Sequence, residues 1–192
     1  MMNRRTLLAS GMAAFWHSAA RAEDGEPKPR RFMMADVNGV IVTDENLLGR
    51  FGLIFFGYMS CPDICPTALM TVADVLKQLG PDAEKVLPLF VTVDPDRDTP
   101  ARMAEFTAAF DPRIVGLRGP KAYVDSMVEA YGAQYEVHVP DPKQPEYYTI
   151  DHTASIMLTG PDGRLIRKLG HDMTSEAIVT AMRKAFADFP LQ

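Results

Sequence analysis

The feature that most constrains the fold is a continuous apolar run, Leu53-Ile54-Phe55-Phe56, followed closely by the segment Cys61-Pro62-Asp63-Ile64-Cys65. An unbroken apolar run of this length is typical of a strand that is buried on both faces. After the second cysteine, apolar residues recur with the helical period from about Pro66 to Leu79, and Gly80 ends the pattern. The sequence therefore places two cysteines between a buried strand and a helix.

The remaining apolar patterns alternate between strand and helix along the chain. We expect a hairpin over 32–43, strands over 53–56, 86–93 and 133–139, a hairpin over 156–169, and helices over 66–79, from Pro100, over about 123–131 and from about Thr174. We expect a polar, proline-rich loop over 140–149. This order favours an α/β fold, namely a thioredoxin-like mixed sheet flanked by helices, with an N-terminal hairpin.

The two last helices should each turn an apolar face inward. These faces are, in order, Tyr123, Val124, Met127, Val128 and Tyr131, then Ile178, Met182, Phe186 and Phe189. There is no internal repeat and no sign of a second domain, so we assign 32–189 to one domain and 23–31 to a flexible lead.

The first 22 residues have the pattern of an export signal. Arg4-Arg5 begins a twin-arginine pattern, a mostly apolar stretch follows, and Ala20-Arg21-Ala22 is a small-x-small cleavage pattern. The stretch over 7–20 is too short to cross a hydrocarbon core of ~30 Å as a helix. The alternatives are an ordinary secretory signal, a disordered basic tail, or an uncleaved signal that acts as an anchor.

The net charge of the chain and its expected compartment limit the kinds of partner and chemistry that it can have. The formal net charge is −5, and removal of 1–22 takes away three arginines and no acid, which leaves −8. A nucleic-acid partner is excluded because no basic stripe is present. The mature chain has no segment apolar enough to span a membrane, so we expect a soluble, periplasmic protein, in a compartment that oxidises thiols.

The cysteine pair suits metal binding or thiol chemistry. An i,i+4 spacing places both sulfurs on one face of a helix, and a helix start favours thiolate. We expect Pro66 at the first helical position. Two soft sulfurs select Cu(I) or Zn, and one imidazole in addition gives a trigonal site that also accepts Cu(II).

Three histidines remain once His17 leaves with the signal. His138 is expected on the polar face of its strand, and His171 in a surface turn. His152 stands at the end of the long loop, just before a buried strand, and this position favours it as the third ligand.

Three blocks of the sequence together resemble the Sco/SenC family. They are the run from Phe56-Gly57-Tyr58 through Cys65-Pro66, the run Val93-Asp94-Pro95-Asp96-Arg97-Asp98-Thr99-Pro100, and Asp151-His152-Thr153. The resemblance implies a thioredoxin-fold copper protein that helps to build the dinuclear copper centre of cytochrome c oxidase. It also implies that Cys61, Cys65 and His152 are the copper ligands. Many members keep a membrane-spanning helix, and this chain departs from them in its cleavable signal.

Other residues near these blocks have less specific roles. We expect the acidic residues of 94–100 to form a solvated turn that caps the next helix. Asp63 either starts the helix or adds an oxygen to the metal, and helix capping is the favoured role. Met59 is a weak candidate for lining the site.

Two functions compete on these residues. The first is a copper metallochaperone that exchanges copper with the copper-site subunit of cytochrome c oxidase or with another copper carrier. The second is a thiol–disulfide oxidoreductase that reduces the cysteines of that copper site, with Cys61 and Cys65 as its redox pair. The C-x-x-x-C spacing and His152 favour metal. A structural disulfide is disfavoured because so short a loop adds little stability, and a structural zinc site would need a fourth ligand.

Overall fold

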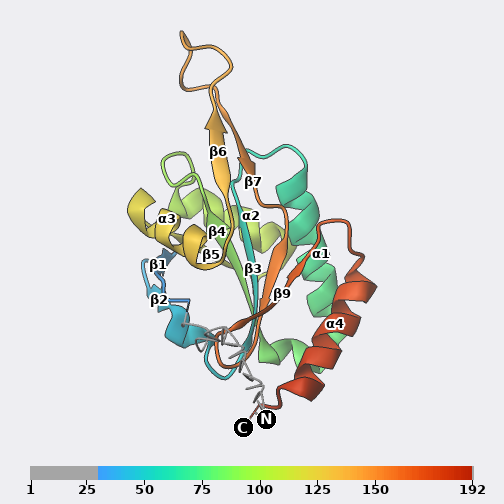
Figure 1. Ribbon diagram of the computed structural model, residues 1–192. Coiled ribbons are helices and arrows are strands. Elements are labelled where there is room, and N and C mark those ends of the chain that lie inside the picture. The colour runs from blue at the N-terminus through green and yellow to red at the C-terminus, as the bar shows by residue number, and fades with distance from the viewer. Residues whose placement is uncertain (1–29, 192) are drawn as a thin grey trace, which may run out of the picture.

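The computed structural model describes residues 30–191, and Figure 1 shows how their elements are arranged. The strands are β1 (Met33–Asp36), β2 (Ile41–Thr43), β3 (Phe51–Gly57), β4 (Val86–Thr92), β5 (Val115–Arg118), β6 (Tyr135–His138), β7 (Thr149–His152), β8 (Ile156–Thr159) and β9 (Leu165–Leu169). The helices are α1 (Ile64–Leu79), α2 (Pro100–Phe110), α3 (Lys121–Ala130) and α4 (Ser175–Asp188), with short 3-10 turns η1 (Asp44–Leu47) and η2 (Gly80–Lys85).

Among the described residues, seven strands form one mixed sheet in the order β2-β1-β5-β4-β3-β8-β9. The central strands β3, β4 and β5 run parallel, whereas β1 and β8 join them antiparallel. In Figure 1, α1 and α4 lie together on one side of the sheet and α3 lies on the other. This is a thioredoxin-like α/β architecture, and it confirms the fold class and the N-terminal hairpin expected from the sequence.

The apolar run Leu53-Ile54-Phe55-Phe56 lies in β3, at the centre of the core. All seven residues of β3 are buried, between β4 and β8 in the sheet. Phe55 stacks on Phe90 of β4, with 6.5 Å between ring centroids. The carboxyl end of β3 is buried in this core. The loop that leads to Cys61 therefore begins at a well-packed end of a central strand.

Helix starts agree with capping chemistry in two cases and differ in a third. The hydroxyls of Thr99 and Thr174 accept the backbone N–H groups of Arg102 and Ala177 at the starts of α2 and α4. Helix α1, however, begins at Ile64, two residues before the expected start. Pro66 is therefore the third helical residue, where its missing N–H still costs nothing because the first turn has no intrahelical acceptor.

Strands β6 and β7 form a separate two-stranded ribbon that projects beyond the body of the molecule (Figure 1). The prediction of a half-buried strand over 133–139 is wrong in its burial, since Val137 and Val139 are exposed. Within residues 30–191 no layer covers this part of the ribbon, so strand alternation does not bury one face. The expected loop over 140–149 forms the tip, but its last residue already belongs to β7, which the sequence did not predict.

Three further expectations need correction. Two consecutive helices were expected between β4 and β6, but β5 separates α2 from α3. Tyr123 and Phe189 were expected to face inward, yet their side chains are 44% and 40% exposed. Both residues lie next to the end of a helix or in its first turn, where less of the neighbouring layer is available to cover them.

The expected export signal (1–22) and most of the flexible lead (23–31) lie outside the described residues. Within 30–191, no helix is both long enough and apolar enough to cross a membrane.

Candidate metal centre

Two parts of the chain that are far apart in sequence bring three candidate ligands together. Cys61 lies in the loop after β3, Cys65 in the first turn of α1, and His152 at the end of β7. One ligand atom from each lies within 4.8 Å of the other two. The structure therefore assembles the three residues that the sequence singled out, with His152 on a strand rather than at the end of a loop.

Cys65 occupies a space that only glycine leaves free. Its side chain is buried, and its sulfur accepts the backbone N–H of Tyr58 at 3.4 Å. A Cβ atom placed on Gly57 would approach that sulfur to 2.6 Å. Real Cβ contacts essentially never come so close, so the glycine at the end of β3 is needed to admit the sulfur.

Burial raises the pKa of the Cys65 thiol, and the N–H of Tyr58 offsets this effect only in part. A helix start favours thiolate, as expected from the sequence, but here desolvation of the charged form outweighs that effect. A bound cation reverses the balance, because metal binding displaces the thiol proton. The buried thiol thus suits a ligand that is deprotonated on metal entry.

His152 is held in the form that a metal ligand requires. Its Nδ1 lies 3.2 Å from the carbonyl oxygen of Thr153, which can only accept, so Nδ1 carries the proton. Its Nε2 then keeps its lone pair and accepts the thiol of Cys65, whose sulfur lies 3.2 Å away. Burial lowers the pKa of His152 and keeps the ring neutral. The edge-on rings of Phe55 and Tyr58 pack against it.

The remaining candidates lie elsewhere. His138 is exposed and pairs with Asp151 at 3.0 Å, and His171 lies in an exposed turn, as expected. Asp63 occupies the N-cap position of α1, but its side chain makes no capping hydrogen bond and is not part of the three-residue cluster. Met59 is partly buried and packs against the core.

The acidic block after β4 differs most from its prediction. Asp94 and Asp98 are buried, with 3% and 0% exposure, rather than part of a solvated turn. Asp98 accepts the N–H of Met59 at 3.1 Å and the hydroxyl of Thr92 at 2.6 Å. It thereby anchors the loop that carries Cys61. This role of Asp98 could not be predicted from the sequence, where its only signal is the high density of aspartates in one turn.

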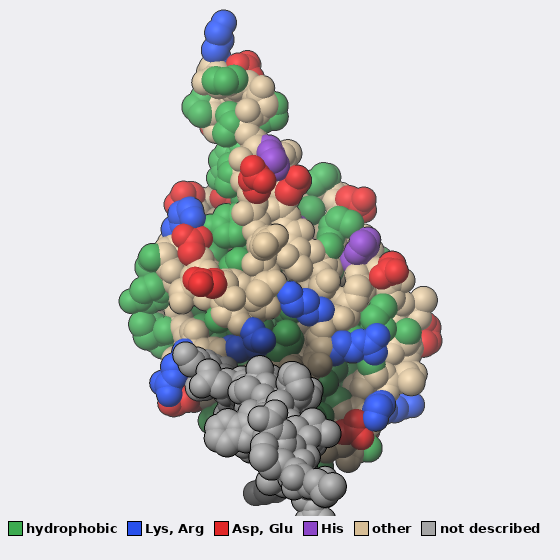
Figure 2. All heavy atoms as spheres, viewed as in Figure 1, with side chains coloured by type: hydrophobic (Ala, Val, Ile, Leu, Met, Phe, Trp, Pro, Cys, Tyr) green, Lys and Arg blue, Asp and Glu red, His purple; other side chains and the backbone are tan. Residues whose placement is uncertain are grey.

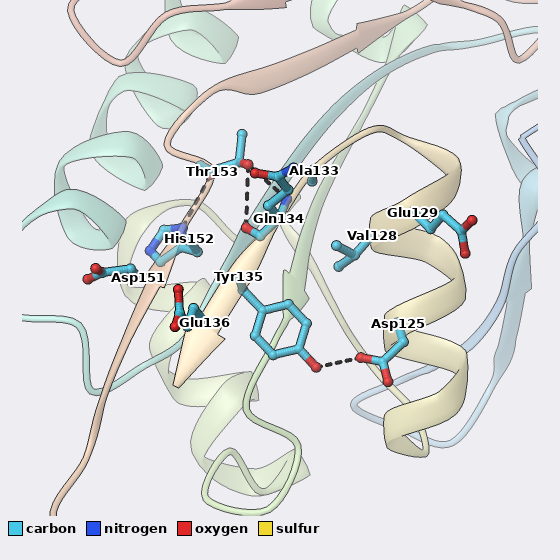
Figure 3. A pocket seen from close by; sticks show the side chains of 10 residues that line it. All are labelled: Asp125, Val128, Glu129, Ala133, Gln134, Tyr135, Glu136, Asp151, His152 and Thr153. Atoms are coloured by element: carbon cyan, nitrogen blue, oxygen red, sulfur yellow. Dashed lines mark hydrogen bonds between the residues drawn. The ribbon is translucent and has the colours of Figure 1, made fainter. Parts of the chain in front are cut away.

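An open pocket of about 700 Å³ lies beside His152, between α3 and the base of the ribbon (Figure 3). Its acidic lining residues are Asp125, Glu129, Glu136 and Asp151. Figure 2 shows hydrophobic side chains along the projecting ribbon above it, and the exposed ones include Val137, Val139 and Tyr147. The His152 side of the centre is therefore next to open, negatively charged surface.

Fold and site together define a class: a thioredoxin-fold protein with a two-cysteine, one-histidine metal site beside the end of β3. Two sulfurs and one neutral imidazole suit copper in either oxidation state. The model of the SCO1/SenC family matches residues 20–187. The chain belongs to the SCO1/SenC family.

Individual relatives agree with this assignment. The chain is 38% identical over 144 residues to the mouse "Protein SCO1 homolog, mitochondrial", covering 73% of this chain and 50% of that protein. It is 39% identical to Bradyrhizobium japonicum ScoI, solved with copper bound, with a TM-score of 0.73 over 81% of this chain and 97% of that one. Copper-bound yeast Sco1 is 32% identical, with a TM-score of 0.74 over 83% and 88%. The chain spans about half the length of the mouse relative.

Proposed function

We propose that this protein is a copper metallochaperone that binds copper through Cys61, Cys65 and His152. The observation that carries the proposal is the approach of three ligand atoms to within 4.8 Å of one another. Related family members have been solved with copper bound. The pairing of soft sulfur with imidazole is the donor set expected for this metal.

The three ligands have different parts in the two oxidation states. Cu(I) is soft and is satisfied by the thiolates of Cys61 and Cys65. Cu(II) gains more from the imidazole of His152, whose Nε2 is already aimed at the Cys65 sulfur. The protein can therefore hold copper before and after a change of oxidation state without assembling a new ligand set.

The cellular role follows from the family. A Sco protein of known structure is described as a member of a family of cytochrome c oxidase assembly proteins. We propose that this chain delivers copper to the dinuclear centre of that oxidase, after export through the signal over 1–22 and release as the domain over 32–189. Cys61, the more exposed cysteine, is the ligand that a receiving copper protein reaches first.

A second function rests on the unequal exposure of the two thiols. Both cysteines are free, Cys61 being partly exposed and Cys65 buried. In disulfide exchange, an accessible thiol can attack the substrate disulfide, and a nearby buried thiol can then resolve the mixed disulfide that forms. Reduction of the cysteines in the oxidase copper site is therefore the alternative, and it requires Cys61 and Cys65 but not His152.

Copper binding and disulfide exchange, measured in wild type and two variants, separate the two functions. The reduced protein should bind one copper ion per chain, and Cys61→Ser should abolish this binding. His152→Ala should weaken Cu(II) binding and leave exchange with a disulfide substrate intact. If His152→Ala leaves Cu(II) binding unchanged while Cys61→Ser abolishes disulfide exchange, the oxidoreductase is the better description.

A further inference from the structure

The candidate ligands belong to two frameworks that share no backbone ladder. Cys61 and Cys65 follow β3, a central strand of the seven-stranded sheet. His152 lies on β7, whose only ladder partner within the described residues is β6. The short connection from His152 to Ile156 joins β7 to β8, which pairs with β3, and so keeps His152 near the cysteines. Backbone pairing does not fix the distance between His152 and the cysteines, and side-chain contacts complete its positioning.

Arg97 makes the contacts that bridge these frameworks. It follows β4 of the main sheet, and its Nη1 donates to the carbonyl oxygen of Tyr148, 3.0 Å away and directly before β7. The guanidinium carbon lies 3.5 Å from the ring centroid of Tyr148 and 5.7 Å from that of Tyr58. A planar cation can stack and donate in this way, whereas an ammonium group cannot do both.

Asp94 and Tyr58 complete the connection. The buried carboxylate of Asp94 pairs with Nε of Arg97 and accepts the hydroxyl of Tyr148 at 2.7 Å. The hydroxyl of Tyr58, at the end of β3, accepts the backbone N–H of Ile150 in β7 at 3.2 Å. The ring of Tyr58 meets the His152 ring edge-on, with centroids 5.9 Å apart. The start of β7 is thus attached at several points to the framework that carries the cysteines.

We propose that Arg97, acting with Asp94 through Tyr148, is a positioning residue that sets His152 for Cu(II). This inference rests on the proposed function. Arg97 is not a ligand, and it acts only through the position of β7. Its effect is therefore confined to the state of copper that depends on the imidazole, and Cu(I), held by two thiolates, is insensitive to it.

The test compares Arg97→Lys with Arg113→Lys. The control makes the same chemical change at an exposed arginine paired with Asp111. Loss of an outer contact that orients a ligand lowers metal affinity by about 10- to 100-fold. We expect that loss for Cu(II) in Arg97→Lys, with a visible absorption spectrum closer to that of His152→Ala. Cu(I) affinity should stay within about twofold of wild type, far less than the loss for Cu(II), because two thiolates hold Cu(I) without the imidazole. The control should match wild type for both ions.

A double-mutant cycle shows whether Arg97 acts through His152. In the His152→Ala background, Arg97→Lys should cause no further loss of Cu(II) affinity, since coupled residues are not additive. The metal-free protein gives a second readout. Amide exchange at Ile150 should be faster in Arg97→Lys than in wild type. Tyr148→Leu, which removes the stacked ring and keeps the carbonyl, should behave in the same way if Arg97→Lys does not fold.

The outcomes separate this inference from the function on which it rests. If wild type binds no copper, or if His152→Ala leaves Cu(II) affinity unchanged, the proposed function is wrong and the inference with it. If His152→Ala weakens Cu(II) binding but Arg97→Lys and Tyr148→Leu do not, the inference alone is wrong. An equal loss of Cu(I) and Cu(II) affinity would show that Arg97 supports only the fold, and would also overturn it.

Discussion

The sulfur of Cys65 and the Nε2 atom of His152 lie 3.2 Å apart, although 87 residues separate them along the chain. The short distance depends on the end of β3, where Gly57 leaves room for the sulfur and Tyr58 donates its N–H to it. The same strand end meets β7 through the Tyr58 hydroxyl. The geometry of the metal centre is therefore fixed by the residues around Gly57 as much as by the ligands themselves.

The first prediction concerns this glycine. In Gly57→Ala the new methyl group should displace the Cys65 sulfur and lower copper affinity, and overpacking should destabilise the fold by about 1–3 kcal/mol. The measurements are copper titration and denaturant unfolding. Gly52→Ala is the matched control, since Gly52 also lies in β3 and its methyl group would collide with Thr159 of β8, away from the cysteines. An equal loss of copper affinity in both variants would contradict the account.

The second prediction concerns the buried carboxyl of Asp98. Asp98→Ala should cost about 1–3 kcal/mol of unfolding free energy, because the N–H of Met59 and the hydroxyl of Thr92 lose their acceptor. Asp98→Asn keeps an acceptor oxygen and should be far less destabilised. Equal losses in the two variants, measured by denaturant unfolding at pH 7, would show that the acceptor role is wrong.

The same residue predicts a dependence of stability on pH. Burial raises the pKa of Asp98 in the folded protein. Between the unfolded and folded pKa values the native state therefore binds more protons, so this group's contribution to stability falls as pH rises through that window. Wild type should gain stability relative to Asp98→Asn as pH is lowered from 7 toward 4. A difference between the two proteins that does not vary with pH would refute this.

Local patterns sufficed for the parts of the fold that are locally determined. The buried run of β3 and the helix starts at Pro100 and near Thr174 could be predicted because apolar runs and helix-start signals act over a few residues. Strand β5 was missed because Val115–Arg118 is short and contains a glycine. Strand β7 was missed because it is a short strand that follows a proline-rich tip.

The candidate ligands could be identified from the sequence, but their surroundings could not. The cysteine spacing and the position of His152 indicated a metal site. The burial of Asp94 could not be predicted from a turn that looks polar in the sequence. It depends on the contact with Tyr148, which is 54 residues away along the chain. The raised pKa of Cys65 likewise comes from burial beneath several elements, which outweighs the local effect of a helix start.

A third prediction links copper binding to the redox state of the cysteines. Their sulfurs lie within 4.8 Å, so a disulfide can form with modest adjustment, and it consumes both thiolates. The oxidised protein should bind no copper, and mild reductant should restore binding in full. Titration of copper before and after reduction measures this. Full copper loading of the oxidised or thiol-blocked protein would count against the site.

A fourth prediction concerns export. The double variant Arg4→Lys, Arg5→Lys keeps the positive charge that an ordinary secretory signal needs but removes the twin-arginine pair. Its export should therefore stop. Cell fractionation measures the outcome, and normal export of the variant would exclude the twin-arginine route.

Cleavage after Ala22 also removes Trp16, the single tryptophan of the chain. Tryptophan fluorescence in the exported protein would contradict cleavage.

The most direct test of the central claim is a Cu(II) titration of the reduced protein beside His152→Ala, with Cu(I) affinity measured on the same samples. We predict one copper ion per chain in wild type, a loss of Cu(II) affinity with an altered visible spectrum in the variant, and nearly unchanged Cu(I) affinity. An identical Cu(II) spectrum and affinity in the two proteins would contradict the assignment of His152 as a ligand.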